Sequence, residues 1–225
     1  MNNIWSEIEA VIAEKSLLKH AFYQAWTAGT LSREDLAYYA QQYYAQESRF
    51  PRYVSAVHSN CPDLKTRQML LENLTHEEAG AENHPELWLR FAESVGASRE
   101  SVQNALPNSG TLKCVETFDR LSRGSWQGGL AALYAYEAQQ PAVASTKIDG
   151  LKSKYSLDSK EALGFFQVHE TMDAWHSSEE KTVLLGQLEH NGAEIKAAVS
   201  EACDALNALL DGVCAERGIG MACAA

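Results

Sequence analysis

Three side chains that commonly bind metal ions, His169, Asp173 and His176, are spaced four and then three residues apart in the run FQVHETMDAWH. Because an α-helix turns by about 100° per residue, this spacing places all three on one helix face. Imidazole and carboxylate groups together suit iron, manganese and zinc. The pattern therefore predicts a metal-binding face on a helix around these residues.

Further candidate ligands lie upstream, on other segments. Glu77 and His84 repeat the seven-residue offset within EEAGAENH, and Glu137 ends the apolar segment LAALYAYE. A buried carboxylate without a partner or a metal is costly, so its apolar surroundings indicate that Glu137 binds a metal ion or a polar partner. Three histidines and three carboxylates from separate helices suit a dinuclear, oxygen-activating metal site inside a helical bundle. The predicted metal ligands are Glu77, His84, Glu137, His169, Asp173 and His176.

Each part of this pattern also has an ordinary structural explanation. Pairs of such residues four apart are common on helix surfaces, and Pro85 disfavours helical dihedrals at His84. The cluster is thus also compatible with a hydrogen-bonded core network in a helical binding protein without catalytic activity. A third reading is a dimetal oxidase or oxygenase that acts on a separate small molecule through the same ligands.

Composition narrows the class of protein. The chain has 225 residues, enough for one domain over residues 1–225, and 19 basic and 30 acidic residues give a net charge of −11. Neither nucleic acid nor a membrane is expected as a partner, because phosphate binding needs clustered basic residues and no apolar run approaches the ~20 residues that span a bilayer. Without a secretory signal, and with five scattered cysteines expected as reduced thiols, the chain is predicted to be cytoplasmic.

Helical periodicity extends over almost the whole chain, and strand-like alternation is absent over any useful length. Ser32 and Asp35 resemble a capping box that begins a tyrosine-rich helix. We therefore expect an all-α domain of seven to eight helices. The helical segments are expected at residues 3–15, 17–28, 33–49, 53–59, 63–83, from Pro85, 111–122, 126–139, 142–154, from Asp158, and 179–216 with a break at Asn191–Gly192. A regular apolar stripe on the last segment favours a homodimer.

Four sequence features together resemble one known family. They are HAFYQAW near the N-terminus, Glu77 with His84, the YAYE run ending at Glu137, and the HxxxDxxH pattern. The chain resembles the haem-oxygenase-like dimetal oxidases over essentially its whole length. Within that group it is most similar to the CADD family, which is linked to 4-aminobenzoate formation for folate. Cofactor-free relatives of this fold lack the six ligands.

The resemblance implies a haem-oxygenase-like helical bundle with two metal ions, Fe/Fe or Fe/Mn, at the six predicted ligands. It also implies O2 as co-substrate and an external reductant. In this family a tyrosine of the protein itself is thought to supply the aromatic ring, and Tyr23 matches it. A lysine is thought to supply the nitrogen, and Lys147 matches it, although periodicity alone does not single it out. Tyr39, Tyr43 and Tyr136 are the implied neighbours for radical transfer.

Overall fold

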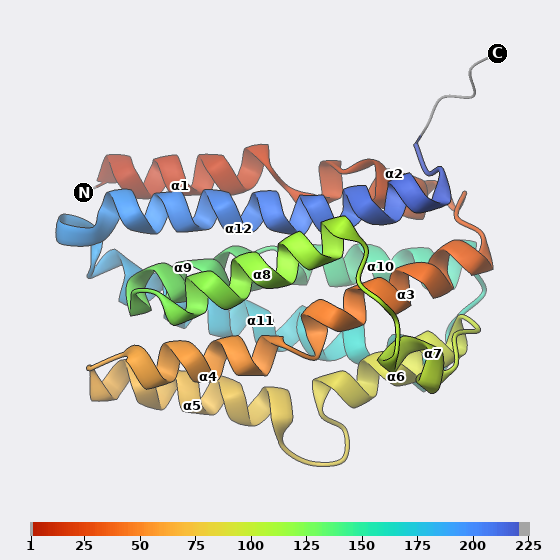
Figure 1. Ribbon diagram of the computed structural model, residues 1–225, viewed down its shortest axis with the longest axis horizontal. Coiled ribbons are helices and arrows are strands. Elements are labelled where there is room, and N and C mark those ends of the chain that lie inside the picture. The colour runs from red at the N-terminus through yellow and green to blue at the C-terminus, as the bar shows by residue number, and fades with distance from the viewer. Residues whose placement is uncertain (1, 221–225) are drawn as a thin grey trace.

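Twelve α-helices and one short 3-10 helix make up the fold within residues 2–220, the residues that the computed structural model describes (Figure 1). The expected all-α class is confirmed, whereas the expected number of seven to eight helices is too low. In chain order the helices are α1 (Asn2–Glu14), η1 (Leu17–Lys19), α2 (Ala21–Ala28), α3 (Arg33–Glu47), α4 (Phe50–Asn60), α5 (Leu64–Glu78), α6 (His84–Ser94), α7 (Arg99–Gln103), α8 (Ser109–Arg123), α9 (Trp126–Glu137), α10 (Gln140–Lys154), α11 (Lys160–Leu185) and α12 (Leu188–Arg217).

The additional helices arise where prolines and caps divide the chain. Pro51 lies in the first turn of α4, so the tyrosine-rich segment ends at Glu47 and a new helix begins at Phe50. Pro141 lies in the first turn of α10, directly after α9. The five-residue helix α7, capped by the Ser98 side chain, was not expected.

The last expected segment is divided at a different place from the one predicted. α11 ends at Leu185 and α12 begins at Leu188, whereas Gly192 lies inside α12. A Cβ atom at Gly192 would lie 2.9 Å from Cδ1 of Ile4. The glycine therefore allows α1 to approach α12 closely, and it does not interrupt the helix.

The apolar stripe of α12 is buried within the chain itself. Each of its residues is at most 3% exposed, and α12 lies against α8, α9 and α1. The stripe consists of Ile195, Val199, Ala202, Leu206, Leu209 and Val213. It therefore gives no argument for a homodimer, and that assembly stays a prediction.

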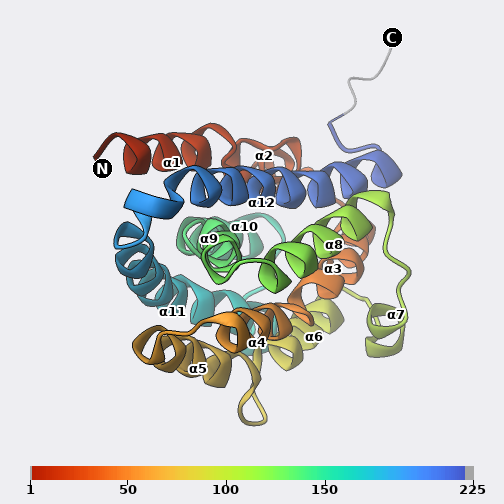
Figure 2. The same cartoon turned by 60° about the vertical axis from the view of Figure 1, so that its left-hand side comes forward.

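Helix α9 lies in the middle of the bundle. Figure 2 shows it end-on, with α4, α8, α11 and α12 around it, and all of these helices pack against it. Every residue from Gly128 to Glu137 is buried. The Glu137 carboxylate is consequently held inside the protein and not on a solvated face. Among residues 2–220, no helix combines the length and the apolar character that crossing a membrane would need.

Helices α8 and α12 approach closely at Gly110, and this contact gives a first prediction. A Cβ atom at Gly110 would lie 2.1 Å from the backbone oxygen of Ala208, which cannot move without displacing α12. We expect Gly110→Ala to lower the free energy of unfolding by about 3 kcal/mol, at the upper end of overpacking costs. The measurement is urea denaturation followed by circular dichroism.

The matched control is Gly164→Ala in α11. A Cβ atom there would meet Cδ2 of Leu87 at 3.6 Å, which is ordinary van der Waals contact. Because alanine favours helix over glycine by about 1 kcal/mol, this variant should be at least as stable as the parent protein. Equal stability of the two variants would contradict the tight α8–α12 contact.

Candidate metal centre

Helix α11 brings its three predicted ligands to the interior of the bundle. It begins after Ser159, whose side chain accepts a hydrogen bond from the Ala162 backbone N–H. His169, Asp173 and His176 lie on one face of the helix, and none is more than 3% exposed. The prediction from the four- and three-residue spacing, that these residues share one face of a helix, is thus confirmed.

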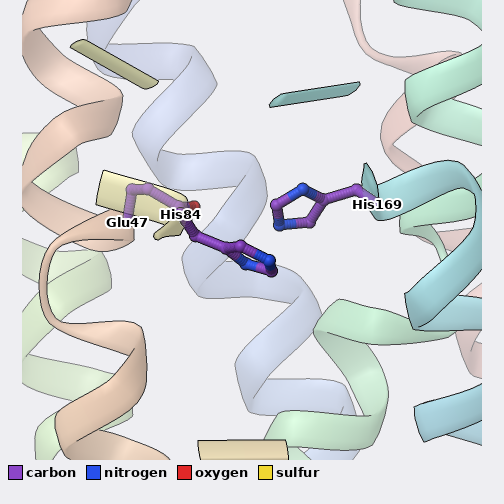
Figure 3. Close-up of side chains that lie close together, drawn as sticks. All are labelled: Glu47, His84 and His169. Atoms are coloured by element: carbon purple, nitrogen blue, oxygen red, sulfur yellow. The ribbon is translucent and has the colours of Figure 1, made fainter. Parts of the chain in front are cut away.

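The three α11 residues are divided between two clusters. In the first cluster, ligand atoms of Glu47, His84 and His169 lie within 4.8 Å of one another. Figure 3 shows these side chains converging from α3, α6 and α11. The second cluster joins Glu137 at the end of α9 with Asp173 and His176, again within 4.8 Å. Each cluster combines imidazole and carboxylate groups, a donor set that suits iron, manganese and zinc.

Glu77 lies beside the first cluster, but it does not share a helix with His84 as their seven-residue offset suggested. The expected helix 63–83 ends at Glu78, and α6 begins at His84 after the Asn83 cap. The seven-residue offset is therefore bridged by a loop, and Glu77 and His84 are on different helices. Oε2 of Glu77 lies 2.9 Å from Nδ1 of His84.

Imidazole and carboxylate groups in and beside the two clusters lie close enough to pair as ions. Nδ1 of His84 with Oε2 of Glu77 is one example, and Nδ1 of His176 at 3.5 Å from Oε1 of Glu137 is another. Both oxygens of Asp173 have no partner in the described part of the chain. Atoms that converge in this way are arranged to share a cation between them.

The charge balance of the interior supports the same interpretation. Five carboxylates and a single lysine are buried among residues 3–220, and no arginine is. The carboxylates are Glu47, Glu77, Glu137, Asp173 and Glu180, and the lysine is Lys147. Buried carboxylates are stable only when paired with cations or protonated. The donor set thus fits two divalent metal ions.

In the metal-free protein, protonation of the buried carboxyl groups removes part of the cost of burying their charge. Burial, together with the charge of Glu137, raises the pKa of Asp173 and of Glu180 well above the ordinary range. Burial and the nearby Glu77 raise the pKa of Glu47 to about 8. Burial and the neighbouring His84 lower the pKa of His169, which favours the neutral imidazole that binds metals. Metal binding should therefore release protons from the carboxyl groups.

Neighbouring groups orient the candidate ligands. Nδ1 of His169 donates to the Phe165 carbonyl oxygen at 2.8 Å, which leaves Nε2 available. Nε2 of His176 lies 3.0 Å from Nδ1 of His76, and Nδ1 of His176 faces Glu137. The Asn73 side chain donates to Oε1 of Glu137 at 2.9 Å. Such outer contacts fix the ring orientation of metal ligands.

The sequence interpretation missed two buried carboxylates, Glu47 and Glu180. Glu180 follows His176 by four residues and so continues the spacing on α11, a signal that was available. Glu47 lies four residues after Tyr43 and shares its helix face, but AQESRF is polar and gives no sign of burial.

The five predicted catalytic residues form one buried cluster beside the first set of ligands. Nζ of Lys147 donates to the Tyr39 hydroxyl at 2.7 Å, and the Tyr39 and Tyr23 hydroxyls lie 3.5 Å apart. The Tyr43 and Tyr136 hydroxyls are hydrogen-bonded at 2.6 Å. Burial lowers the pKa of Lys147 to about 7, which leaves a large fraction of the amine neutral at neutral pH.

The fold and the donor set define a class of helical proteins with buried candidate metal ligands, and sequence comparison identifies the family. Residues 37–210 match the family model described as iron-containing redox enzyme. The chain belongs to this family. Two solved structures share the fold: a TenA homologue from Pseudomonas syringae pv. tomato and a CADD-like protein from Nostoc punctiforme. Their TM-scores are 0.79 and 0.76 at 17% and 19% identity, and the alignments cover 94% and 97% of this chain and 91% and 98% of theirs.

Within the family, the chain is a homologue of proteins named 4-aminobenzoate synthase. The protein from Nitrosomonas europaea is 40% identical over 94% of this chain and 91% of its own length. The protein from Chlamydia muridarum is 38% identical over 93% of this chain and 89% of its own length. The resemblance inferred from the sequence motifs is thereby confirmed.

Proposed function

We propose that this protein forms 4-aminobenzoate in an oxygen-dependent reaction in which Tyr23 supplies the ring and Lys147 the amino nitrogen. The observation that carries the proposal is the buried Lys147 amine, whose Nζ lies 5.5 Å from the centre of the Tyr23 ring. A lysine so buried and without a carboxylate hydrogen-bond partner is costly to maintain, which indicates a chemical role.

The six predicted ligands, Glu77, His84, Glu137, His169, Asp173 and His176, would hold two ions, Fe/Fe or Fe/Mn. Such ions, with O2 and an external reductant, supply the oxidising capacity that the reaction needs. Deep burial of both clusters keeps bulk water from the reacting groups.

Tyr23 is suited to a sacrificial role by its surroundings. It is 2% exposed, and burial raises the pKa of its phenol, so the ring keeps its proton until it is oxidised. 4-Aminobenzoate contains a ring, one carboxyl carbon and one nitrogen. Tyr23 would contribute the ring and Cβ: its Cα–Cβ bond would break, and O2 would serve as the oxidant that takes Cβ to the carboxylate. Nζ of Lys147 would replace the phenolic oxygen, which would leave as water, and the Nζ–Cε bond would break.

The other three tyrosines connect Tyr23 with the candidate metal centre. The Tyr39 ring lies between Tyr23 and Tyr43, with its centre 5.4 Å from that of Tyr43. Tyr43 is hydrogen-bonded to Tyr136, and Tyr136 donates to Oε2 of Glu47 at 3.2 Å. This series of closely packed phenols supports electron movement between Tyr23 and the first cluster.

Isotope labelling tests the source of the ring. Protein produced with ring-labelled tyrosine, loaded with iron or iron and manganese and given O2 and reductant, should release labelled 4-aminobenzoate, with at most one product per chain. Tyr23→Phe should retain both ions and release none. Tyr38→Phe is the control, because Tyr38 lies on α3 but bonds to Asn108 and not to the cluster. Unlabelled product, or full activity of Tyr23→Phe, would instead favour a separate small-molecule substrate.

A further inference from the structure

Glu47 has two carboxylate oxygens with different surroundings. Oε2 accepts the hydroxyl hydrogen of Tyr136, whereas Oε1 has no partner among the described residues. The side chain is only 1% exposed, so Oε1 is removed from bulk solvent. A buried carboxylate oxygen without a hydrogen bond or a counter-ion is costly, so we expect Oε1 to bind a ligand.

A carboxylate oxygen of Glu47 lies close to two imidazoles. Ligand atoms of His84 and His169 lie within 4.8 Å of the Glu47 ligand atom and of each other (Figure 3). Nε2 of His169 is available because its Nδ1 is used by the Phe165 carbonyl. One carboxylate oxygen and two imidazole nitrogens converging on a single point form a donor set for a transition metal ion.

Among the described residues, no basic side chain forms a hydrogen bond or an ion pair with Glu47, although the charges of His84 and Lys147 act on it. Lys147 is the only lysine or arginine buried among the described residues, and its Nζ donates to Tyr39 and not to Glu47. Glu77, whose Oε2 lies 2.9 Å from Nδ1 of His84, adds a second carboxylate beside the cluster. The local charge therefore calls for a metal ion at the Glu47–His84–His169 position.

We infer that Glu47 is a seventh metal ligand, which would hold the first ion through Oε1 and the Tyr136 hydroxyl through Oε2. This inference rests on the proposed function only in its use of a resident metal ion. It adds a direct link: the carboxylate that binds the ion also fixes the Tyr136 phenol and, through it, Tyr43. Glu47 is consequently both a ligand and the positioning residue for the tyrosine series.

Anaerobic metal titration tests the inference without any measurement of product. Wild-type protein, Glu47→Gln, Tyr136→Phe and Glu34→Gln are titrated with Mn²⁺ and Fe²⁺, and bound metal is counted by mass spectrometry. Glutamine keeps the size of Glu47 and an oxygen for Tyr136 but removes the anionic ligand. We expect wild type to bind two ions, and Glu47→Gln to bind one of them at least about tenfold more weakly.

The other variants separate ligand loss from general damage. Tyr136→Phe should bind both ions with nearly wild-type affinity, because it removes only the hydrogen bond on Oε2. Glu34 is an exposed glutamate on the same helix, and Glu34→Gln should behave as wild type. Glu47→Asp retains the charge on a shorter side chain and should restore part of the lost affinity. Circular dichroism checks that each variant is folded.

The outcomes are distinguishable. Two ions bound with wild-type affinity by folded Glu47→Gln would overturn the Glu47 assignment and leave the proposed function intact. Failure of wild-type protein to bind either ion would overturn both. If Glu47→Gln does not fold, equal affinities of Glu47→Asp and wild type would overturn the assignment, and a weakened single site would support it.

Discussion

Replacing Lys147 with methionine is expected to stabilise the metal-free protein by about 4 kcal/mol at pH 6. Burial lowers the pKa of Lys147 from 10.5 to about 7, a difference that corresponds to about 5 kcal/mol of cost when the amine is protonated in both states. Loss of the hydrogen bond to Tyr39 offsets about 1 kcal/mol of the gain. Methionine has a similar length and no charge to desolvate.

The pH dependence of this gain identifies its cause. Below about pH 7 the lysine is charged in the folded and the unfolded chain, so the full cost is present. As the pH rises from about 7 towards 10.5, the folded protein already holds the neutral amine, and the cost and the gain both diminish. Urea denaturation at pH 6 and pH 9 should therefore show a larger gain at pH 6.

Lys152→Met is the matched control, because Lys152 is exposed on the same helix and should change stability by less than about 0.5 kcal/mol. Under the proposed function, Lys147→Met should also bind both ions yet release no 4-aminobenzoate. A Lys147→Met variant no more stable than Lys152→Met at pH 6 would show that the ammonium is compensated in the folded protein.

The second large effect is expected on removal of metal. Without metal, stability should fall as the pH rises from about 5 to 7. The raised pKa of Glu47, from 4.5 to about 8, means that the folded state keeps a proton that the unfolded state loses. Over these two pH units this loss amounts to about 3 kcal/mol from Glu47 alone. Asp173 and Glu180 act in the same direction.

Neither His169 nor Lys147 reverses this fall in stability between pH 5 and pH 7. The lowered pKa of His169 makes stability rise with pH, but only below about pH 6.5. It is a single group, whereas three carboxyl groups act in the other direction. Lys147 is largely protonated in both states up to about pH 7, so its contribution is nearly constant there.

Bound ions should remove this loss of stability with pH. They replace the protons on the carboxylates, and each ion at about a thousandfold excess over its dissociation constant adds about 4 kcal/mol. The measurement is urea denaturation at pH 5, 6 and 7, with Mn²⁺ under anaerobic conditions and with a chelator. Parallel pH profiles in the two conditions would contradict a metal site at these carboxylates.

The parts of the site that depend on local periodicity were predictable from the sequence. His169, Asp173 and His176 belong to one uninterrupted helix, so their spacing determines their common face. Glu137 was recognisable because α9 is apolar on all sides and a carboxylate in it must be buried. The capping box at Ser32 and Asp35 is likewise a local signal, and both of its hydrogen bonds are present.

The remaining features depend on contacts between distant segments. The Glu77–His84 spacing was read as helical, yet a loop containing Gly80 at φ +82° bridges the two residues, and tertiary packing brings them together. Glu47 lies in a polar stretch, and only the packing of α3 against α6 and its neighbours buries it. Burial of Lys147 also follows from packing, which explains why periodicity did not single it out.

Both clusters take residues from α11, and this has a consequence for biosynthesis. A ribosome releases Glu47 and His84 long before His169, so the nascent chain lacks a complete set of ligands until α11 has been made. Metal capture must then follow most of translation. The ligands of both clusters would therefore take up their ions only from the metals that meet an almost finished chain, and not from those that meet the early nascent chain.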